Sequence, residues 1–341
     1  MITSKEALDL LINENFLNLG KGATEIRFKL NPEPIVTFVV DRNINYTNIC
    51  ESGCKFCAFY RKEGDREAYL LNVEDILKKV KELRDAGGTQ LLIQGGLHPN
   101  INIDYFVKLF KEIKKHFPDI IIHSLSPAEI IHIAKKSNKT IAETLRILKD
   151  AGLESIPGGG AEILVDEIRK KISPNKIGWQ EWELVMREAY KLGMKGTATM
   201  MFGSIERPED IIKHLERIRN FQEKTGFFRA FIPWTYQPGN NELGGKKASS
   251  YYYLRVLAVS RIFLHNIQNI QASWVTQGPK VSQLALFFGA NDMGGTMLEE
   301  NVVSATGFKF IMDRSEIVEL IKEAGFIPVV RNTRYEIIGK A

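Results

Sequence analysis

The strongest constraint on the fold is a repeated alternation of short apolar runs with amphipathic helical patterns. The first run, "PIVTFVVDR" at 34–42, is β-branched and uninterrupted, as expected for a strand that is buried on both faces. Further strand candidates follow at 89–96, 119–126, 153–160, 195–203, 227–237, 269–275 and 287–291. Helical patterns separate them at 72–87, 103–117, 140–152, 178–193, 207–226 and 249–266. This alternation predicts an α/β fold, a (β/α)8 barrel of the TIM type, with a doubly wound open sheet as the alternative.

Both flanks of the barrel pattern carry extra elements. Helical patterns over about 4–18 and 20–30 precede it, and 312–338 is typical of a helix followed by an extended segment. We therefore predict one domain over 1–341, with a core at about 34–310, N-terminal helices in 1–33 and an extension at 311–341 that packs on the barrel. Polar and glycine-rich residues follow nearly every strand, which favours a barrel with its site at the carboxyl ends of the strands.

Composition limits the class of protein. A hydrophobic fraction of 44% and a charged fraction of 26% are ordinary for a globular chain, and the net charge of +5 is spread along the sequence. Nucleic-acid binding would require a denser basic stripe. No run approaches about 18 uninterrupted apolar residues, and the first apolar pattern contains acidic residues, unlike a signal peptide. We expect a cytoplasmic protein with no membrane or nucleic-acid partner.

All three cysteines lie in one loop after the first strand. Cys50, Cys54 and Cys57 are spaced C-x3-C-x2-C in "CESGCKFC". An odd number of cysteines in one loop does not build a disulfide framework. Three clustered thiolates can hold three irons of a cubane cluster and leave the fourth iron open. The alternatives are less favoured, because zinc sites usually take a second ligand pair and a thioredoxin-like "CKFC" uses only two of the cysteines.

This loop, with Phe56 just before the third cysteine, resembles the signature of the radical S-adenosylmethionine superfamily. The resemblance implies a 4Fe-4S cluster on Cys50, Cys54 and Cys57 whose open iron takes S-adenosylmethionine. It also implies reductive cleavage of that co-substrate to methionine and a 5'-deoxyadenosyl radical. The electron would come from a low-potential donor such as flavodoxin or ferredoxin.

The same resemblance implies cofactor-binding residues at other strand ends. "QGG" at 94–96 is similar to the motif that meets the methionine amino group, although Leu97 stands where the family has an acidic residue. A turn requiring positive φ is the alternative there. For Glu162 the alternative is a helix cap, and for Arg169 a solvated helix charge. The cofactor-binding residues so implied are Phe56, Phe59, Gln94, Gly95, Gly96, Ser124, Ser126, Glu162 and Arg169.

The second half resembles a narrower family, the cyclases of the futalosine route to menaquinone. The strings that carry this resemblance are "SIPGGGAEIL", "FIPWTYQPGN", "SWVTQGPK" and "GANDMGGTM", and it extends over about 25–335. It implies that dehypoxanthine futalosine loses the hydrogen on its ribose C4' and closes a bond to its benzoate ring. Aminofutalosine synthases and deazaflavin-forming synthases are the related alternatives. A non-catalytic iron-sulfur carrier is a different class, and it would need a fourth cysteine.

Within that reaction the substrate carboxylate and ribose need cations and amides at the strand ends. The candidate substrate-binding residues are Arg42, Arg229, Trp234, Gln237, Gln277 and Lys280. Tyr236 and Trp274 are further candidates for the wall around the aromatic ring, with core packing as the alternative. The candidate catalytic residues are His98 and Asp292, for the final proton, and Tyr60 beside Cys57. For Arg42 an ion pair, and for His98 and Asp292 a loop hydrogen bond, are equally open readings.

Overall fold

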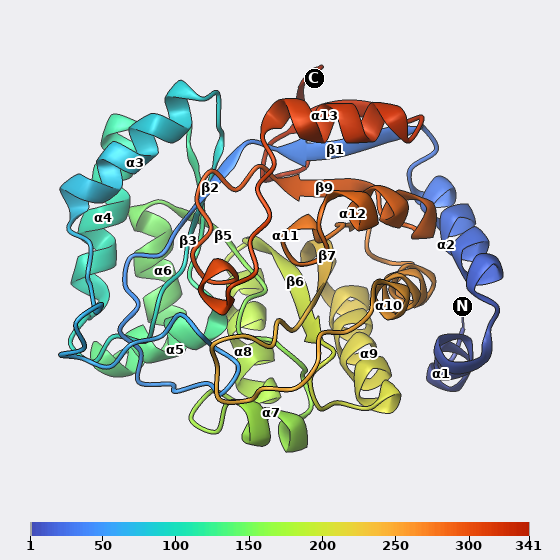
Figure 1. The fold of residues 1–341 in the computed structure, drawn as a ribbon. Coiled ribbons are helices and arrows are strands. Elements are labelled where there is room, and N and C mark those ends of the chain that lie inside the picture. The colour runs from blue at the N-terminus through green and yellow to red at the C-terminus, as the bar shows by residue number, and fades with distance from the viewer. Residues whose placement is uncertain (1, 341) are drawn as a thin grey trace.

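The computed structural model describes residues 2–340, in which parallel strands are surrounded by helices (Figure 1). The strands are β1 (Ile35–Val39), β2 (Asp41–Ile44), β3 (Gln90–Ile93), β4 (Ile121–Ser124), β5 (Leu153–Ile156), β6 (Lys195–Phe202), β7 (Phe228–Thr235), β8 (Asn269–Ile270), β9 (Asp292–Gly295), β10 (Ile327–Arg331) and β11 (Ile337–Lys340). The longer helices are α1 (Ser4–Asn13), α2 (Phe16–Leu30), α3 (Val73–Asp85), α4 (Ile103–His116), α5 (Pro127–Lys136), α6 (Ile141–Ala151), α8 (Trp179–Lys191), α9 (Pro208–Thr225), α10 (Ser250–Phe263) and α13 (Arg314–Glu323). The short ones are α7 (Asp166–Ile172), α11 (Trp274–Gln277) and α12 (Pro279–Ala285).

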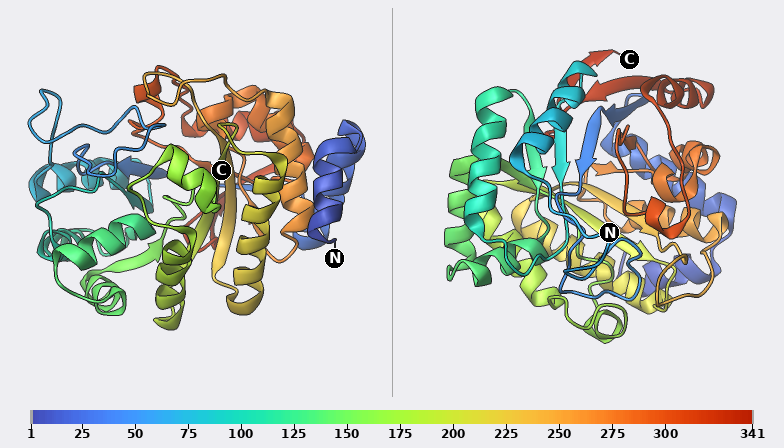
Figure 2. Two further views of the ribbon diagram at one scale, coloured as in Figure 1. Left: turned by 90° about the horizontal axis from the view of Figure 1, so that it is seen from below. Right: turned by 60° about the vertical axis from the view of Figure 1, so that its left-hand side comes forward.

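Strands β2 to β8 form a seven-stranded parallel sheet in chain order. Strand β1 runs almost directly into β2 and pairs in parallel with β9, and a parallel bridge from Gln271 to Asp292 joins the end of β8 to β9. The sheet thereby curls back on itself, with β1 and β2 together as its first strand. Figure 2 shows the helices on the outside of this curled sheet. The predicted TIM-type barrel is confirmed over the doubly wound alternative.

Local sequence signals explain where the helices around the site begin. Asn72 accepts a hydrogen bond from the Asp75 amide and caps α3, and Ser126 with Glu129 forms a reciprocal capping box on α5. Helix α5 and the short helices α7, α11 and α12 were not predicted from the sequence. The two predicted N-terminal helices are present, but the boundary between them lies at 14–15 and not near 19, since Asn15 accepts hydrogen bonds from the amides of Leu17 and Asn18 and starts α2.

The strand predicted near 287–291 is wrong. Residues Leu286–Phe288 form a 3-10 turn, and the strand begins only at Asp292. The apolar residues of this turn pack against helix α2, because the centroids of the Phe288 and Phe16 rings lie 4.6 Å apart with the rings tilted by 37°. Gly289, at φ +100°, then ends the turn.

The C-terminal extension joins the barrel instead of only covering it. Strand β10 pairs in parallel with β1, and α13 packs on β10 at the top of Figure 1. The turn after β10 lies against the starts of β5 and β7, where Arg334 forms an ion pair with Glu154 at 3.0 Å. This turn therefore closes the amino-terminal end of the barrel. Among residues 2–340, no helix combines the length and apolar character needed to cross a membrane.

Candidate active site

The loop between β2 and α3 places the three cysteines at the carboxyl ends of the strands. Strand-like bridges pair Ile49 with Arg61 and Thr47 with Leu70, so the loop folds back on itself. The Arg61 guanidinium donates hydrogen bonds to the carbonyl oxygens of Ala58 and Tyr60 at 3.0 and 2.9 Å. These contacts give the cysteine loop a defined shape within the barrel mouth.

The cysteines lie at one end of a cavity of about 390 Å³ that continues into the barrel. The cavity collects the predicted site residues from six segments of the chain. Those that line it are Cys50, Cys54, Cys57, Phe56, Phe59, Tyr60, Gln94, Gly95, Gly96, Ser126, Glu162, Trp234 and Trp274. Residues far apart in the sequence thus share one enclosed space, as a site at the carboxyl ends of barrel strands requires.

Hydrogen-bond donors surround the cysteine sulfurs. The Cys50 Sγ accepts from the Leu97 amide at 3.3 Å and from the Ser52 amide at 3.4 Å, and the Ser52 hydroxyl lies 3.1 Å from the Cys54 Sγ. Burial raises the pKa of Cys54 and of Cys57, so both remain protonated as free thiols. Metal binding would displace those protons, and the donors to sulfur would then stabilise the thiolates.

This arrangement fits a cubane iron-sulfur cluster. Among residues 2–340, no three His, Cys, Asp or Glu side chains converge closely enough to hold a single metal ion. A cubane cluster does not need such convergence, because each cysteine binds a different iron atom. Three thiols with amide donors around them supply three corners and leave one iron for a ligand from outside the protein.

Gly95 and Gly96 bring β3 close to the cysteine loop. Neither has a positive φ, so the alternative explanation of a left-handed turn is wrong. Close approach is the reason instead. A Cβ on Gly96 would overlap the Ile49 carbonyl oxygen, and one on Gly95 would lie 2.7–2.9 Å from the Tyr46 ring. Backbone amides of the glycine pair are thereby held beside the cysteines.

Glu129 is a site residue that the sequence reading missed. Its buried carboxylate accepts from the Gly95 amide at 2.9 Å and the Tyr46 hydroxyl at 3.0 Å. Its other oxygen accepts from the Ser126 amide and hydroxyl at 2.7 and 2.6 Å. Burial raises the pKa of Glu129 despite these donors. The capping-box pattern "SPAE" at 126–129 is the sequence signal that could have identified it.

Glu162 forms a buried ion pair with Lys176 at 2.5 Å inside the cavity. Burial alone would raise the pKa of Glu162, but Lys176 and Arg169 outweigh it and the pKa lies below its usual value. Glu162 does not cap the next helix, because the N-cap of α7 is Val165. Its backbone is left-handed at φ +41°, which for a glutamate indicates a conformation imposed by its surroundings. No sequence signal distinguished Lys176 from the neighbouring lysines.

Arg169 lies outside the cavity lining and holds the segment that carries Glu162. Its guanidinium donates to the carbonyl oxygens of Gly160, Ala161 and Ile177. It is buried, not the solvated helix charge considered above. It therefore shapes the turn after β5 instead of facing a ligand.

The far end of the cavity is polar and lies deep in the barrel. Asp41 and Gln90 line it from the starts of β2 and β3, and Arg331 and Tyr335 line it from the C-terminal extension. Trp234 of β7 forms part of the side wall. A ligand that reaches past the cysteine end would meet these groups.

Several predicted residues lie outside the lining of this cavity, and each has another partner. His98 accepts the Asn100 amide on Nδ1 at 3.1 Å. Ser124 is buried and donates to the Ile93 carbonyl at 2.7 Å. Arg42 pairs with Glu82 of α3 and with Glu299 of the loop after β9.

The remaining predicted residues also lie outside the cavity lining, and all of them except Lys280 have another hydrogen-bond partner within residues 2–340. Asp292 accepts two hydrogen bonds from Arg331, at 2.5 and 2.9 Å. Arg229 donates to the Ser155 hydroxyl at 3.2 Å near the start of β7. Gln237 and Gln277 both donate to the Thr235 hydroxyl. Lys280 is exposed on α12 and Tyr236 is buried with its hydroxyl on Asn241 at 2.6 Å.

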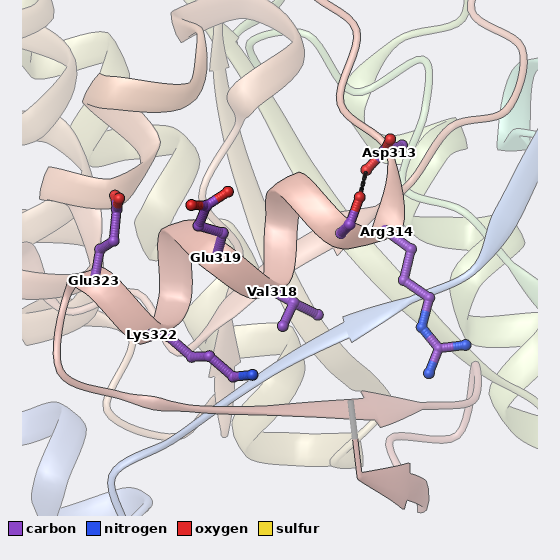
Figure 3. Close-up of a pocket in the computed structure, with 7 residues that line it drawn as sticks. Asp313, Arg314, Val318, Glu319, Lys322 and Glu323 are labelled. Atoms are coloured by element: carbon purple, nitrogen blue, oxygen red, sulfur yellow. Dashed lines mark hydrogen bonds between the residues drawn. The ribbon is translucent and has the colours of Figure 1, made fainter.

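A second hollow runs along α13 on the surface and differs in kind (Figure 3). Its lining comes from the single segment 313–323, with charged side chains that extend into solvent (Figure 3). Asp313 accepts a hydrogen bond from Ser315 there and caps the helix. The lining of this hollow contains no cysteine. Apart from the hydrogen bond at the helix cap, its side chains do not converge on a common point.

Two family sequence models match successive parts of the chain. The sequence model of the Radical SAM superfamily matches residues 44–218, and that of the CofH/MqnC C-terminal region matches residues 224–340. The first covers the cysteine loop through α9. The second covers the last barrel strands and the extension that closes the barrel.

Curated relatives extend over nearly the full chain. A cyclic dehypoxanthine futalosine synthase of Halalkalibacterium halodurans is 48% identical, over 99% of this chain and 91% of that protein. One of Streptomyces coelicolor is 44% identical, over 98% and 85%. A 5-amino-6-(D-ribitylamino)uracil–L-tyrosine 4-hydroxyphenyl transferase of Methanopyrus kandleri is also 44% identical, over 93% and 88%.

Solved structures agree on the fold. The crystal structure of methylornithine synthase (PylB) superposes with a TM-score of 0.76 at 19% identity, covering 96% of this chain and 94% of that one. The HydG maturase of Carboxydothermus hydrogenoformans also gives 0.76, at 16% identity, covering 98% and 77%.

Proposed function

Because this chain belongs to the radical S-adenosylmethionine superfamily, we propose that it cyclises dehypoxanthine futalosine to cyclic dehypoxanthine futalosine in menaquinone biosynthesis. The observation that carries the proposal is the 48% identity, over almost the whole chain, to a synthase named for that product. The chain is a radical S-adenosylmethionine enzyme, and the choice of substrate is the step that needs an experiment.

The cofactor end of the cavity suits such an enzyme. When bound, a 4Fe-4S cluster on Cys50, Cys54 and Cys57 with S-adenosylmethionine supplies methionine and a 5'-deoxyadenosyl radical. The Gly95 and Gly96 backbone would lie along the methionine part of the co-substrate. The Glu162 carboxylate would accept hydrogen bonds from its ribose hydroxyls, because Lys176 keeps that carboxylate ionised.

The rest of the cavity would hold the substrate. Trp234 would offer a flat face to the benzoate ring, and Phe56, Phe59 and Tyr60 line the cysteine end of the cavity. In the proposed reaction the substrate ribose would give up its C4' hydrogen atom, and the C4' carbon would then bond to the ring. Loss of one electron and one proton restores the aromatic ring. No acid or base at neutral pH removes an unactivated C–H hydrogen, so the protein contributes positioning, dryness and a proton acceptor.

A related function has its own support. The 44% identity to the Methanopyrus kandleri transferase favours, as a second candidate, a synthase that joins two separate substrates. Such an enzyme would consume L-tyrosine together with 5-amino-6-(D-ribitylamino)uracil. Dehypoxanthine futalosine would then be inert.

One experiment separates these candidates. The reconstituted enzyme is incubated anaerobically with S-adenosylmethionine, a strong reductant and dehypoxanthine futalosine, and in parallel with the two transferase substrates. The proposal predicts 5'-deoxyadenosine in step with a product lighter than dehypoxanthine futalosine by two hydrogens. A coupled product from L-tyrosine in the parallel reaction, with dehypoxanthine futalosine unchanged, would establish the second candidate.

A further inference from the structure

Asp41 is a carboxylate at the far end of the cavity from the cysteines. It lines the same cavity as Cys50, Cys54 and Cys57 and is only 2% exposed. Its Oδ1 accepts from the Met297 amide at 2.9 Å, and its Oδ2 accepts from the Gln90 Nε2 at 3.2 Å. Gly295 leaves the room for this carboxylate, because a Cβ there would overlap all of it. The Asp41 carboxylate thus lies against the backbone of β9.

Within residues 2–340, no lysine, arginine or histidine forms an ion pair with Asp41. Arg331 is the nearest arginine in the cavity wall, but its Nε and Nη2 donate to Asp292. Burial therefore dominates and raises the pKa of Asp41 to about 6, with Asp292 adding to the rise. The Met297 amide, Arg331 and Gln90 oppose it. A buried carboxyl of this kind is a far better proton acceptor than an ordinary aspartate.

The other acids of the cavity are committed to partners. Glu129 accepts four hydrogen bonds, and Glu162 is paired with Lys176. Glu300 accepts from the amides of Val302, Val303 and Ser304 at 2.7–2.9 Å. The pKa of His123 is lowered to about 3 by burial, which makes it a weak base. Among the cavity-lining carboxylates of residues 2–340, Asp41 is the one with neither a cation nor three donors.

On the basis of the proposed function, we propose that Asp41 is the base that takes the proton released when the aromatic ring is restored. After the C4' carbon has bonded to the ring, the C–H bond at that ring carbon breaks. Its proton goes to the Asp41 carboxylate, and one electron goes to a one-electron acceptor of the iron-sulfur class. Hydrogen abstraction from C4' precedes this step and does not involve Asp41. His98 and Asp292, which the sequence suggested for this role, do not line the cavity.

The test measures how much cyclised product forms per 5'-deoxyadenosine in the Asp41→Asn holoenzyme. Asp85→Asn, an exposed carboxylate on α3, is the matched control. We expect Asp41→Asn to form 5'-deoxyadenosine at the wild-type rate with an unchanged KM, while product per 5'-deoxyadenosine falls by about a hundredfold. Product formation at the wild-type ratio would overturn the assignment of Asp41 alone. Absence of cyclised product from the wild-type enzyme would overturn the proposed function and this assignment together.

A second variant keeps the carboxylate and needs no loss of activity. The product ratio of the wild-type enzyme should rise with pH through about 6, as Asp41 ionises. Gln90→Met removes a hydrogen-bond donor to the ionised carboxylate of Asp41. The rise of the product ratio should therefore move to higher pH in this variant. Asp41→Asn should abolish it. If the product ratio rises over the same pH range in both variants as in the wild type, another group accepts the proton.

Discussion

At the scale of single residues, the cavity separates two kinds of buried carboxylate. Glu162 has a cation beside it and stays ionised, as a group that accepts hydroxyl hydrogen bonds should. Asp41 has no ion-pair partner among residues 2–340 and a raised pKa, as a group that takes up a proton should. Environment, not residue type, gives the two acids their different roles.

Replacing Glu162 by Gln should weaken S-adenosylmethionine binding by at least about tenfold, because a charged hydrogen-bond acceptor is lost and Lys176 is left unpaired. Anaerobic calorimetric titration measures this directly. Glu167→Gln, exposed on the first turn of α7, is the control and should bind normally. Unchanged affinity in Glu162→Gln would return this residue to a structural role.

The Cys54→Ala variant should lose cleavage of S-adenosylmethionine completely, because a cluster with two protein ligands does not hold its fourth iron open for the co-substrate. The helical circular dichroism should remain, since the cysteine lies in a loop and not in the barrel core. The chain has no cysteine outside this loop to serve as a control. Retained cleavage would refute the cluster assignment.

Stability should report the buried charge on Asp41. Its folded pKa of about 6 exceeds the unfolded value, so its favourable contribution is present at low pH and is lost as pH rises through about 6. The Asp41→Asn variant has no carboxyl group at this position, so it does not lose this stability as the pH rises. Relative to wild type, its free energy of unfolding should rise by about 1–2 kcal/mol between pH 5 and pH 8, measured by denaturant titration. A pH-independent difference would place the pKa of Asp41 in its ordinary range.

At the scale of elements, neighbouring side chains of a strand point in opposite directions, and this decides which residues reach the site. Along β2, Asp41 and Asn43 line the cavity while Arg42 between them points to α3. Along β4, His123 lines the cavity and its neighbour Ser124 does not. Sequence reading found the strands from 35 to 270 to within a few residues and missed the position of β9. Buried parallel strands are apolar on both faces, so they carry no alternation that shows which side chains point into the barrel. That is why it selected Arg42 and Ser124.

Gly96 tests the packing between β3 and the cysteine loop. An added Cβ in Gly96→Ala would overlap the Ile49 carbonyl oxygen, and this backbone atom cannot rotate away. We expect a loss of about 1–3 kcal/mol in stability and less iron bound per chain. Gly339→Ala adds a Cβ with nothing within 4 Å and should match wild type in both measurements. Normal iron content in Gly96→Ala would mean that the loop can move aside.

At the scale of the whole molecule, the C-terminal extension is part of the cavity wall. Sequence patterns indicated that it would pack on the barrel. They gave no sign that Arg331 and Tyr335 would line the cavity, because this depends on β10 pairing with β1 across nearly the whole chain length. The division into core and extensions that the sequence suggested stays a prediction. The cysteine loop, in contrast, could be identified from the sequence because the spacing of its three cysteines is local.

The buried pair of Asp292 and Arg331 should hold the extension in place. Asp292→Asn leaves the Arg331 charge without its partner, so the free energy of unfolding should fall by about 3–5 kcal/mol. Glu154→Gln removes a more exposed partner of Arg334 in the same segment and should cost about 1 kcal/mol or less. Folded Asp292→Asn enzyme should keep its product ratio. A selective loss of that ratio would restore Asp292 as the proton acceptor.

In the proposed reaction this cavity directs a radical to the ribose C4' of dehypoxanthine futalosine. The most direct measurement uses substrate carrying deuterium at C4' and follows the mass of 5'-deoxyadenosine under anaerobic turnover. We expect one deuterium in 5'-deoxyadenosine for each cyclised product formed. Unlabelled 5'-deoxyadenosine, with deuterium retained in recovered substrate, would contradict it.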